Sequence, residues 1–339
     1  MKRLMPERLN RYRFLVLILV LGLLGGVARI LFKPDRPSDL DKMKAAADRG
    51  TADDQLKLAQ MFFRGAGVPL NYAEAAQWYR KAAEQGKAEA QSALGWMYKR
   101  ALGVPLDYAE SLKWYLKAAE QQFPEALFNL GTMYFMGEGV AQDYREAHQW
   151  YLKAAGLGDA EAQYKVGAMY YRREGVPQDF AEAARWYRQA GAQGFVRAQS
   201  DLGTMYFNGK GVPQDYGEAI QWIRQAAENG FPKAQSDLGS IYLHGTGLPQ
   251  NYDEARQWYI KASAQGSSAA QFNLGEMYAN GTGVIQDLVE AYKWYHFATL
   301  NGHKTAGQTR DQLALKMTPE QVAEALNRAS KATVKRVAR

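Results

Sequence analysis

Residues 209–222 read GKGVPQDYGEAIQW, a glycine-rich turn followed by acidic residues and the start of an amphipathic segment. A glycine-rich loop in front of a helix can cradle a phosphate, so this stretch could be a ligand site or only a turn. The same kind of stretch recurs in six other places, for example as GAGVPLNY, GEGVAQDY and GTGLPQNY. Because a phosphate site is expected once in a chain and not seven times, we interpret the stretch as a structural turn.

Tryptophan gives the period of this repetition. Seven of the eight tryptophans are spaced 36 residues apart, and only Trp96 lies off this lattice. A fixed period of this size is typical of solenoids, in which each repeat is one supersecondary unit stacked on the next. The lattice predicts an all-α chain with seven helix–turn–helix repeats, at 51–86, 87–122, 123–158, 159–194, 195–230, 231–266 and 267–302. The lattice tryptophans are Trp78, Trp114, Trp150, Trp186, Trp222, Trp258 and Trp294.

Each repeat, numbered here from position 1 to position 36, carries the pattern of two helices. Positions 4–14 form the first helix, and its apolar residues recur at the spacing of one helical face. Position 9 of this helix is glycine in six repeats and Ala59 in the other, which indicates that the two helices approach closely. In the second helix, Asp or Asn at position 21 and Glu at position 24 predict a capping box. Tryptophan at position 28 is expected to fill the space between the helices. Position 17 is always glycine, so a positive φ is expected at Gly67, Gly103, Gly139, Gly175, Gly211, Gly247 and Gly283.

The repeat at 198–230, AQSDLGTMYFNGKGVPQDYGEAIQWIRQAAENG, resembles the Sel-one-like repeat family, a relative of the tetratricopeptide repeats. This resemblance covers about three quarters of the chain. It implies antiparallel helix pairs stacked into a right-handed α-solenoid, with the first helix of each pair on the concave wall. It also implies an adaptor for protein–protein contacts, a role common in bacterial envelopes and signalling.

The residues before the repeats predict a membrane anchor. Residues 1–13 are basic, and residues 14–28 are uncharged. A snorkelling Arg29 would extend the apolar segment to 14–32, close to the ~20 residues that a bilayer requires. The basic end should stay in the cytoplasm, which places the repeats in the periplasm as part of a single-pass inner-membrane protein. The alternative is a signal peptide that is cleaved after residue 28, which would make the repeats secreted or periplasmic.

The remaining segments read as connections and caps. Residues 33–40 contain two prolines and alternating charges, which favour a linker, and residues 41–50 resemble the end of a second helix, with Ala46 in its alanine column. Residues 303–339 predict C-terminal capping helices and a basic tail, with Thr318 as an N-cap. Such caps are needed where a repeat array ends.

Charge and residue types narrow the classes of function. The net charge of +7 comes from the ends of the chain, because residues 51–302 carry 23 Lys and Arg against 27 Asp and Glu. Nucleic-acid affinity depends on clustered cations, so no nucleic-acid partner is expected. Cysteine is absent, and the four histidines are scattered without metal-ligand spacing. No catalytic motif is present, so we expect no enzyme activity, no cofactor and no metal.

If the constant positions build the fold, the variable positions of the first helix remain for recognition. We expect a groove that binds an acidic, partly apolar segment of a partner protein, clamped at Trp96 by Arg64 and Arg100, since Trp and Arg are frequent hot-spot residues. The alternative is that Trp96 and the aromatic residues at position 13 pack between repeats. The groove candidates are Trp96, Arg64, Arg100, Phe63, Phe128, Tyr164 and Arg172.

A second class of function stays open at this point. The chain could bind or hydrolyse a cell-wall or β-lactam-related ligand, because a cysteine-rich branch of the resembled family is linked to β-lactam binding. That branch has a cysteine pair in each repeat, and this chain has no cysteine. The adaptor function is therefore the better supported prediction, and the sequence does not identify the partner.

Overall fold

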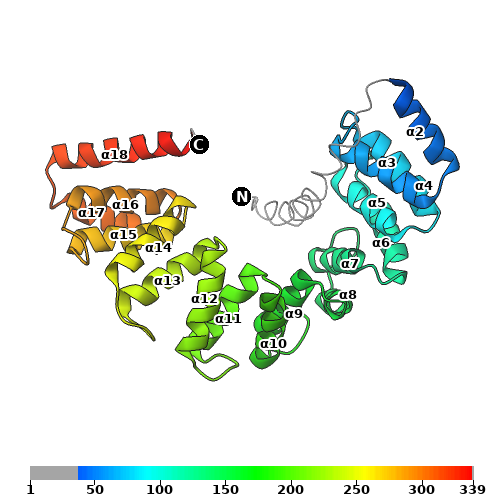
Figure 1. Cartoon of the computed structure of the whole chain (residues 1–339). Coiled ribbons are helices and arrows are strands. Elements are labelled where there is room, and N and C mark those ends of the chain that lie inside the picture. Colours follow the sequence, from blue (N-terminus) through cyan, green and yellow to red (C-terminus); the bar gives the residue numbers. More distant parts are fainter. Residues whose placement is uncertain (1–36, 338–339) are drawn as a thin grey trace. The chain divides into compact units, whose positions relative to one another are not determined.

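The computed structural model describes residues 37–337, with side chains described from residue 40 to residue 332. Within that range all regular secondary structure is helical, which confirms the predicted all-α solenoid of seven repeats (Figure 1). The predicted basic terminus and membrane segment, 1–13 and 14–32, lie outside the described residues. Among the described helices, none is both long enough and apolar enough to cross a membrane.

The seven repeats are helical hairpins of two 13-residue helices each. The chain divides into two compact units, one ending at Ala154 and one beginning at Ala155, and each is described by itself. The helices are α2 (Pro37–Arg49), α3 (Ala52–Arg64), α4 (Tyr72–Glu84), α5 (Ala88–Arg100), α6 (Tyr108–Glu120), α7 (Pro124–Met136), α8 (Tyr144–Gly156), α9 (Ala160–Arg172), α10 (Phe180–Ala192), α11 (Val196–Asn208), α12 (Tyr216–Glu228), α13 (Pro232–His244), α14 (Tyr252–Ala264), α15 (Ser268–Asn280), α16 (Leu288–Leu300), α17 (Ala306–Ala314) and α18 (Pro319–Val337).

Glycine at position 9 brings the two helices of a repeat into close contact. A Cβ atom added at Gly275 would lie 2.5 Å from the ring of Tyr295, and one at Gly131 would lie 2.7 Å from the ring of Tyr151. The ring at position 29 therefore rests directly on the backbone of the first helix. Position 29 is tyrosine in six repeats and isoleucine in the other, and these side chains are buried in every repeat.

The tryptophans at position 28 are less central than the sequence predicted. Trp78, Trp114 and Trp258 are buried, whereas the other four lattice tryptophans are half-buried. In several repeats a lysine three residues later covers the indole ring, with its ammonium 4.0 Å from the ring centre in the pair of Lys81 and Trp78. Tryptophan therefore covers the outer part of each repeat, while the residue at position 29 fills the space between its helices.

The glycine at position 17 is required for two reasons. All seven of these glycines have a positive φ, between 66° and 78°. In addition, a Cβ atom at Gly103 would lie 2.2 Å from the backbone of Tyr72, and one at Gly283 would lie 2.2 Å from the Cβ of Tyr252. In five repeats the turn therefore packs on the first residue of the second helix in the preceding repeat, at Gly103, Gly139, Gly211, Gly247 and Gly283. The turn is a structural contact, as the sequence indicated.

The capping box predicted at the second helix is only half formed. The side chain at position 21 accepts a backbone hydrogen bond at the helix start, as Asp215 does from Glu218 at 3.0 Å. The glutamate carboxylate does not complete the box in the repeats whose caps are described. In two repeats it accepts a hydrogen bond from the tryptophan indole instead, as Glu218 does from Trp222 at 3.1 Å. The glutamate thus orients the tryptophan of its own helix.

A buried glutamine at position 5 joins consecutive repeats. The Gln91 amide donates to the carbonyl of Ala83 in the preceding repeat at 3.0 Å, and its oxygen accepts from Gln121 at 2.9 Å. Six repeats have this glutamine, and it satisfies a carbonyl at the end of a helix. Repeat 3 is the exception and has Leu127 at this position and Leu157 at position 35. The sequence analysis missed this contact.

The ends of the array differ in part from the predictions. Helix α2 begins at Pro37, inside the segment predicted as a linker. Ala46 is exposed and Ala47 is buried, because no first helix lies against the Ala46 side within the described residues. At the other end, Thr318 and Gln321 form the predicted capping box at the start of α18, with the Gln321 side chain accepting from the Thr318 backbone at 2.9 Å.

Candidate recognition surface on the first helices

Hydrogen bonds between first helices define which positions lie side by side. Gln60 at position 10 donates to Glu89 at position 3 of the next repeat, at 2.8 Å. Lys233 at position 3 donates in the same way to Thr204 at position 10 of the repeat before it, at 3.2 Å. Position 3 of one repeat therefore lies beside position 10 of the preceding repeat, and together they form the variable surface between neighbouring repeats.

A small pocket lies on this surface between repeats 1, 2 and 3, all within unit 1. It has a volume of about 50 Å³, and we call it the Trp96 pocket. Trp96 is half-buried, and its ring meets the ring of Phe63 edge-on at a centroid distance of 5.8 Å. The pocket thus brings together three of the predicted groove residues. It is lined by Gln60, Phe63, Arg64, Tyr79, Glu89, Ala93, Trp96, Met97 and Glu125.

The charge of the Trp96 pocket differs from the predicted charge. Arg64 lines it, as expected, but Arg100 does not. Two carboxylates that the sequence analysis did not single out, Glu89 and Glu125, also line it. They stand at position 3, in the first turn of their helices, which is a favourable place for an acid at any helix start and gave no functional signal. Carboxylates outnumber guanidinium groups in the lining.

Repeat 2 departs from the other repeats at the position of Trp96. In repeats 3 and 6, position 10 holds a hydroxyl that meets the buried tyrosine of the second helix, at 3.1 Å between Thr132 and Tyr151 and at 2.9 Å between Ser240 and Tyr259. Trp96 has no such hydroxyl, and the Tyr115 hydroxyl is buried without a hydrogen-bond partner among the described residues. Burying an unpaired hydroxyl costs roughly 1–3 kcal/mol. Trp96 is therefore unfavourable for the fold at this point.

Repeat 2 also has an unusual residue at position 13. Most other repeats have an aromatic ring there, whereas repeat 2 has Lys99, which is 7 % exposed. Its ammonium lies 2.6 Å from the carboxylate of Glu138 in the turn of the next repeat, and burial lowers the pKa of Lys99. This ion pair joins repeats 2 and 3, where the buried glutamine contact is replaced by Leu127. These departures from the repeat pattern thus lie in repeats 2 and 3, which also contribute residues to the Trp96 pocket.

Phe128, one of the predicted groove residues, is buried in the structure. Phe128 is 3 % exposed, and its ring lies 5.3 Å from that of Tyr151 in the second helix of its repeat. Its side chain therefore lies against the second helix, whereas Tyr164 and Phe272 at the same position are half-buried. Serines at the same position, such as Ser92 and Ser200, are buried too.

The aromatic residues at position 13 pack within their own repeats. Phe63 lies 5.3 Å from Tyr72, and Phe207 lies 5.1 Å from Tyr216, in each case at the start of the second helix. Two of them also contact the next repeat, as the predicted alternative has it. Phe63 contacts Trp96, and the Tyr171 hydroxyl accepts from Lys210 at 3.0 Å.

The two other groove candidates belong to unit 2. Tyr164 is half-buried, stacks on Tyr187 at 5.4 Å and donates its hydroxyl to Asp201 at 3.1 Å. Burial raises the pKa of the Asp201 carboxyl. Arg172 is exposed. These residues form a local polar cluster that is separate from the Trp96 pocket, so the sequence grouped residues that the structure assigns to different units.

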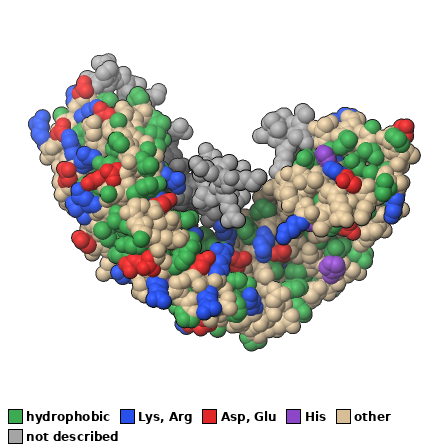
Figure 2. Space-filling model, turned by 180° about the vertical axis from the view of Figure 1, so that it is seen from behind, with side chains coloured by type: hydrophobic (Ala, Val, Ile, Leu, Met, Phe, Trp, Pro, Cys, Tyr) green, Lys and Arg blue, Asp and Glu red, His purple; other side chains and the backbone are tan. Residues whose placement is uncertain are grey.

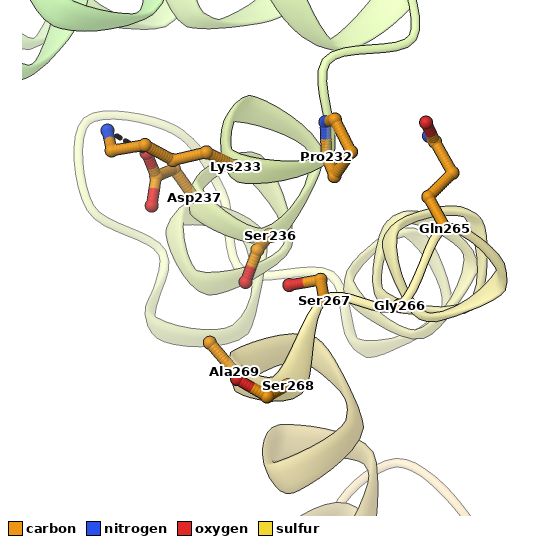
Figure 3. A pocket seen from close by; sticks show the side chains of 9 residues that line it. All are labelled: Pro232, Lys233, Ser236, Asp237, Gln265, Gly266, Ser267, Ser268 and Ala269. Atoms are coloured by element: carbon orange, nitrogen blue, oxygen red, sulfur yellow. Dashed lines mark hydrogen bonds and ion pairs between the residues drawn. The ribbon is translucent and has the colours of Figure 1, made fainter. Parts of the chain in front are cut away.

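A larger cleft in unit 2 was not predicted. It has a volume of about 390 Å³ and lies where α13 begins and the turn between α14 and α15 passes (Figure 3). Lys233 in this cleft is ion-paired with Asp237 at 3.0 Å, and most other lining residues are small (Figure 3). Its serines and glycine read as ordinary turn residues in the sequence. The lining is Pro232, Lys233, Ser236, Asp237, Gln265, Gly266, Ser267, Ser268 and Ala269.

The described surface carries charges of both signs. On the face drawn in Figure 2, basic and acidic side chains are interspersed. Among the described residues no group of three or more His, Asp or Glu side chains is placed to hold a metal ion.

Comparison with known proteins identifies the repeat. The Sel1 repeat matches residues 52–87, 88–123, 124–159, 160–195, 196–231, 232–267 and 268–303. These seven matches have the period of the tryptophan lattice. No curated protein matched the chain.

Two solved structures are similar over most of the chain. A Sel1 repeat protein from Oxalobacter formigenes is 35 % identical, with 80 % of this chain and 78 % of that chain covered and a TM-score of 0.66. A protective antigen present in uropathogenic Escherichia coli strains, described as displaying an SLR fold, is 29 % identical, with 86 % of each chain covered and a TM-score of 0.51. Seven family matches over most of its length, together with this likeness, show that the chain belongs to the Sel1 repeat family.

Proposed function

We propose that this protein is an interaction scaffold that binds a segment of a partner protein at the Trp96 pocket. Sel1 repeat proteins are generally non-enzymatic scaffolds for protein interactions. One observation carries the choice of site. In repeat 2 a half-buried tryptophan stands at position 10, where no other repeat has an aromatic residue, and the Tyr115 hydroxyl is buried without a partner among the described residues. Natural proteins break the rules of their own fold mainly where function requires it.

The size of the pocket supports a protein partner over a small molecule. Sites for small molecules commonly have volumes of roughly 300–1,000 Å³. The Trp96 pocket has about 50 Å³, which is enough for the end of one side chain. This favours a peptide anchor and weighs against a β-lactam-sized ligand at this place. The sequence predicted a partner segment that is acidic and partly apolar, and the aromatic lining of the pocket supports the apolar part of that prediction.

The proposal is tested by replacing Trp96 with the residue that repeat 3 has at the same position. Trp96→Thr removes the indole and supplies a hydroxyl for Tyr115, so we expect the thermal midpoint to be unchanged or higher. Cross-linked pull-downs from solubilised membranes should recover a partner with the wild type and lose it with Trp96→Thr. Thr204→Ala, at position 10 of repeat 5, is the control and should keep the partner. A partner that Trp96→Thr retains would refute the proposed site.

We also propose that residues 14–32 tether the repeats to the cytoplasmic membrane, with the repeats on the periplasmic side. The proposal is supported by the uncharged segment and the basic residues before it. An alkaline phosphatase fusion after residue 40 should be active only if residue 40 has crossed the membrane. Retention in the membrane pellet after carbonate extraction would distinguish an anchor from a cleaved signal peptide.

A further inference from the structure

We propose that the Trp96 pocket binds a cationic side chain, a lysine or an arginine in the partner segment. This inference rests on the proposed function and specifies its chemistry. It reverses the sign of the charge that the sequence suggested for the partner.

The lining of the pocket has the two features that recognise a cation. Trp96, Phe63 and Tyr79 provide aromatic rings, whose faces attract an ammonium or guanidinium group. Glu89 and Glu125 provide carboxylates that can accept its hydrogen bonds. Glu89 already accepts a hydrogen bond from the amide of Gln60 at 2.8 Å, which restricts its side chain.

The other classes of anchor fit this lining less well. An acidic side chain would be repelled by two carboxylates. A purely apolar side chain would remove water from the exposed Glu89 carboxylate, which is unfavourable. A lysine or arginine places its charged end beside the carboxylates and contacts the rings with its methylene chain.

The protein already uses the same combination within its own repeats. The ammonium of Lys117 lies 4.5 Å from the ring centre of Trp114, whose indole donates to Glu110 at 3.1 Å. In these second helices the cation comes from the same helix. At Trp96 the lysine three residues later, Lys99, is instead held by Glu138 at 2.6 Å. A cationic side chain of a partner at Trp96 would repeat the combination of ring, cation and carboxylate found in the second helices.

Replacing Arg64 tests the proposal, because a cationic and an acidic anchor predict opposite changes in binding affinity. Its exposed side chain lines the pocket and places a positive charge beside an incoming cation. If the anchor is cationic, Arg64→Ala removes a repulsion and should strengthen binding. If the anchor is acidic, the same change removes an attraction and should weaken binding.

The experiment uses the full chain in detergent, labelled with 5-fluorotryptophan and observed by fluorine NMR. The resonance of Trp96 is assigned by its loss in Trp96→Phe. The probes are blocked pentapeptides, acetyl-Gly-Gly-X-Gly-Gly-amide, with lysine, arginine, norleucine or glutamate at X. We expect lysine and arginine probes to shift the Trp96 resonance at concentrations roughly tenfold lower than norleucine, in line with the strength of a cation–aromatic contact. The glutamate probe should bind worst.

Two charge variants complete the test. The pair Glu89→Gln and Glu125→Gln should abolish the preference for lysine over norleucine, and Arg64→Ala should increase the affinity for the lysine probe. Glu84→Gln, which removes an exposed carboxylate outside the pocket lining, is the matched control and should change neither. Preference for glutamate, or weaker lysine binding in Arg64→Ala, would overturn the inference.

Failure of this inference can be told apart from failure of the proposed function. If Trp96→Thr loses the pulled-down partner while the lysine and arginine probes leave the Trp96 resonance unchanged, the pocket binds a partner of another chemistry. If Trp96→Thr retains the partner, the pocket is not the docking site.

Discussion

At the scale of single residues, close packing within most repeats depends on a glycine in the first helix. Glycine at position 9 lowers helix stability by roughly 1 kcal/mol relative to alanine, yet six repeats have it. The reason is the aromatic or branched side chain at position 29, which rests on the glycine backbone. Repeat 1 shows the consequence of one additional methyl group. It has Ala59, and its Tyr79 is 6 % exposed, against 0–3 % for the corresponding tyrosines of the other repeats.

Gly275→Ala should therefore destabilise the protein although alanine favours helix. Its Cβ would lie 2.5 Å from two ring atoms of Tyr295, which is too close for any real contact. We expect a net loss of roughly 1–3 kcal/mol, the usual cost of overpacking, measured as a lower urea midpoint. Gly156→Ala, in helix α8, has no atom within 4 Å of the added Cβ and is the control. Its midpoint should be equal to or above that of the wild type, and an equal loss in both variants would contradict this explanation.

The sequence predicted the glycines better than the tryptophans, for a physical reason. A periodic glycine indicates a backbone constraint, and the structure shows that constraint as a close contact or a positive φ. A periodic aromatic residue shows that a ring packs somewhere, but not which ring is deepest. The tyrosine next to each tryptophan has the same period. Only the direction of the helix face decides that position 29 fills the centre and position 28 the outer part.

At the scale of helices, consecutive repeats are held together by buried hydrogen bonds as well as by apolar contacts. The amide at position 5 satisfies a helix-end carbonyl of the preceding repeat and accepts from position 35 of its own repeat. Repeat 3 has leucine at both positions, Leu127 and Leu157. The two positions thus change together within one chain, which is what a shared contact predicts. The sequence analysis missed this because glutamine on a helix reads as a solvent-exposed residue.

Gln91→Leu should cost more than the loss of one ordinary hydrogen bond. It removes two hydrogen bonds at once, one to the Ala83 carbonyl and one from the Gln121 amide, each worth roughly 0.5–1.5 kcal/mol. Gln121 also donates to the carbonyl of Gly86, which limits the loss. The double variant Gln91→Leu and Gln121→Leu repeats the pair found in repeat 3 and should recover part of the stability. Additive losses in a double-mutant cycle of urea midpoints would show that the two side chains act independently.

At the scale of the whole molecule, the fold was predictable because the same sequence pattern recurs in all seven repeats. Seven copies average out local exceptions, so the period, the turns and the helix pairs could all be read from the sequence. The recognition site is the opposite case, because it depends on exceptions that occur once. The sequence singled out Trp96 as the one tryptophan off the lattice, and the structure adds Glu89 and Glu125 beside it. Those acids stand at an ordinary helix-start position, and only the packing of neighbouring repeats brings them to the tryptophan.

The same repetition predicts that damage at one end of the array stays local. In a solenoid each repeat contacts mainly its neighbours, so stability is a sum of local interfaces. Helix α18 closes the C-terminal end by packing Ala325, which is 0 % exposed, in a cluster with Tyr292 and Tyr295 of α16. Ala325→Glu places a charge in this contact and should release α18.

Hydrogen exchange should then rise in α18 and α16, while exchange in helices α3 to α6 stays at the wild-type level. Ala323→Glu adds the same charge to the same helix at an exposed position and is the matched control, with no change expected. A rise in exchange along the entire chain in Ala325→Glu would show that the array unfolds as one cooperative block and would refute the local description.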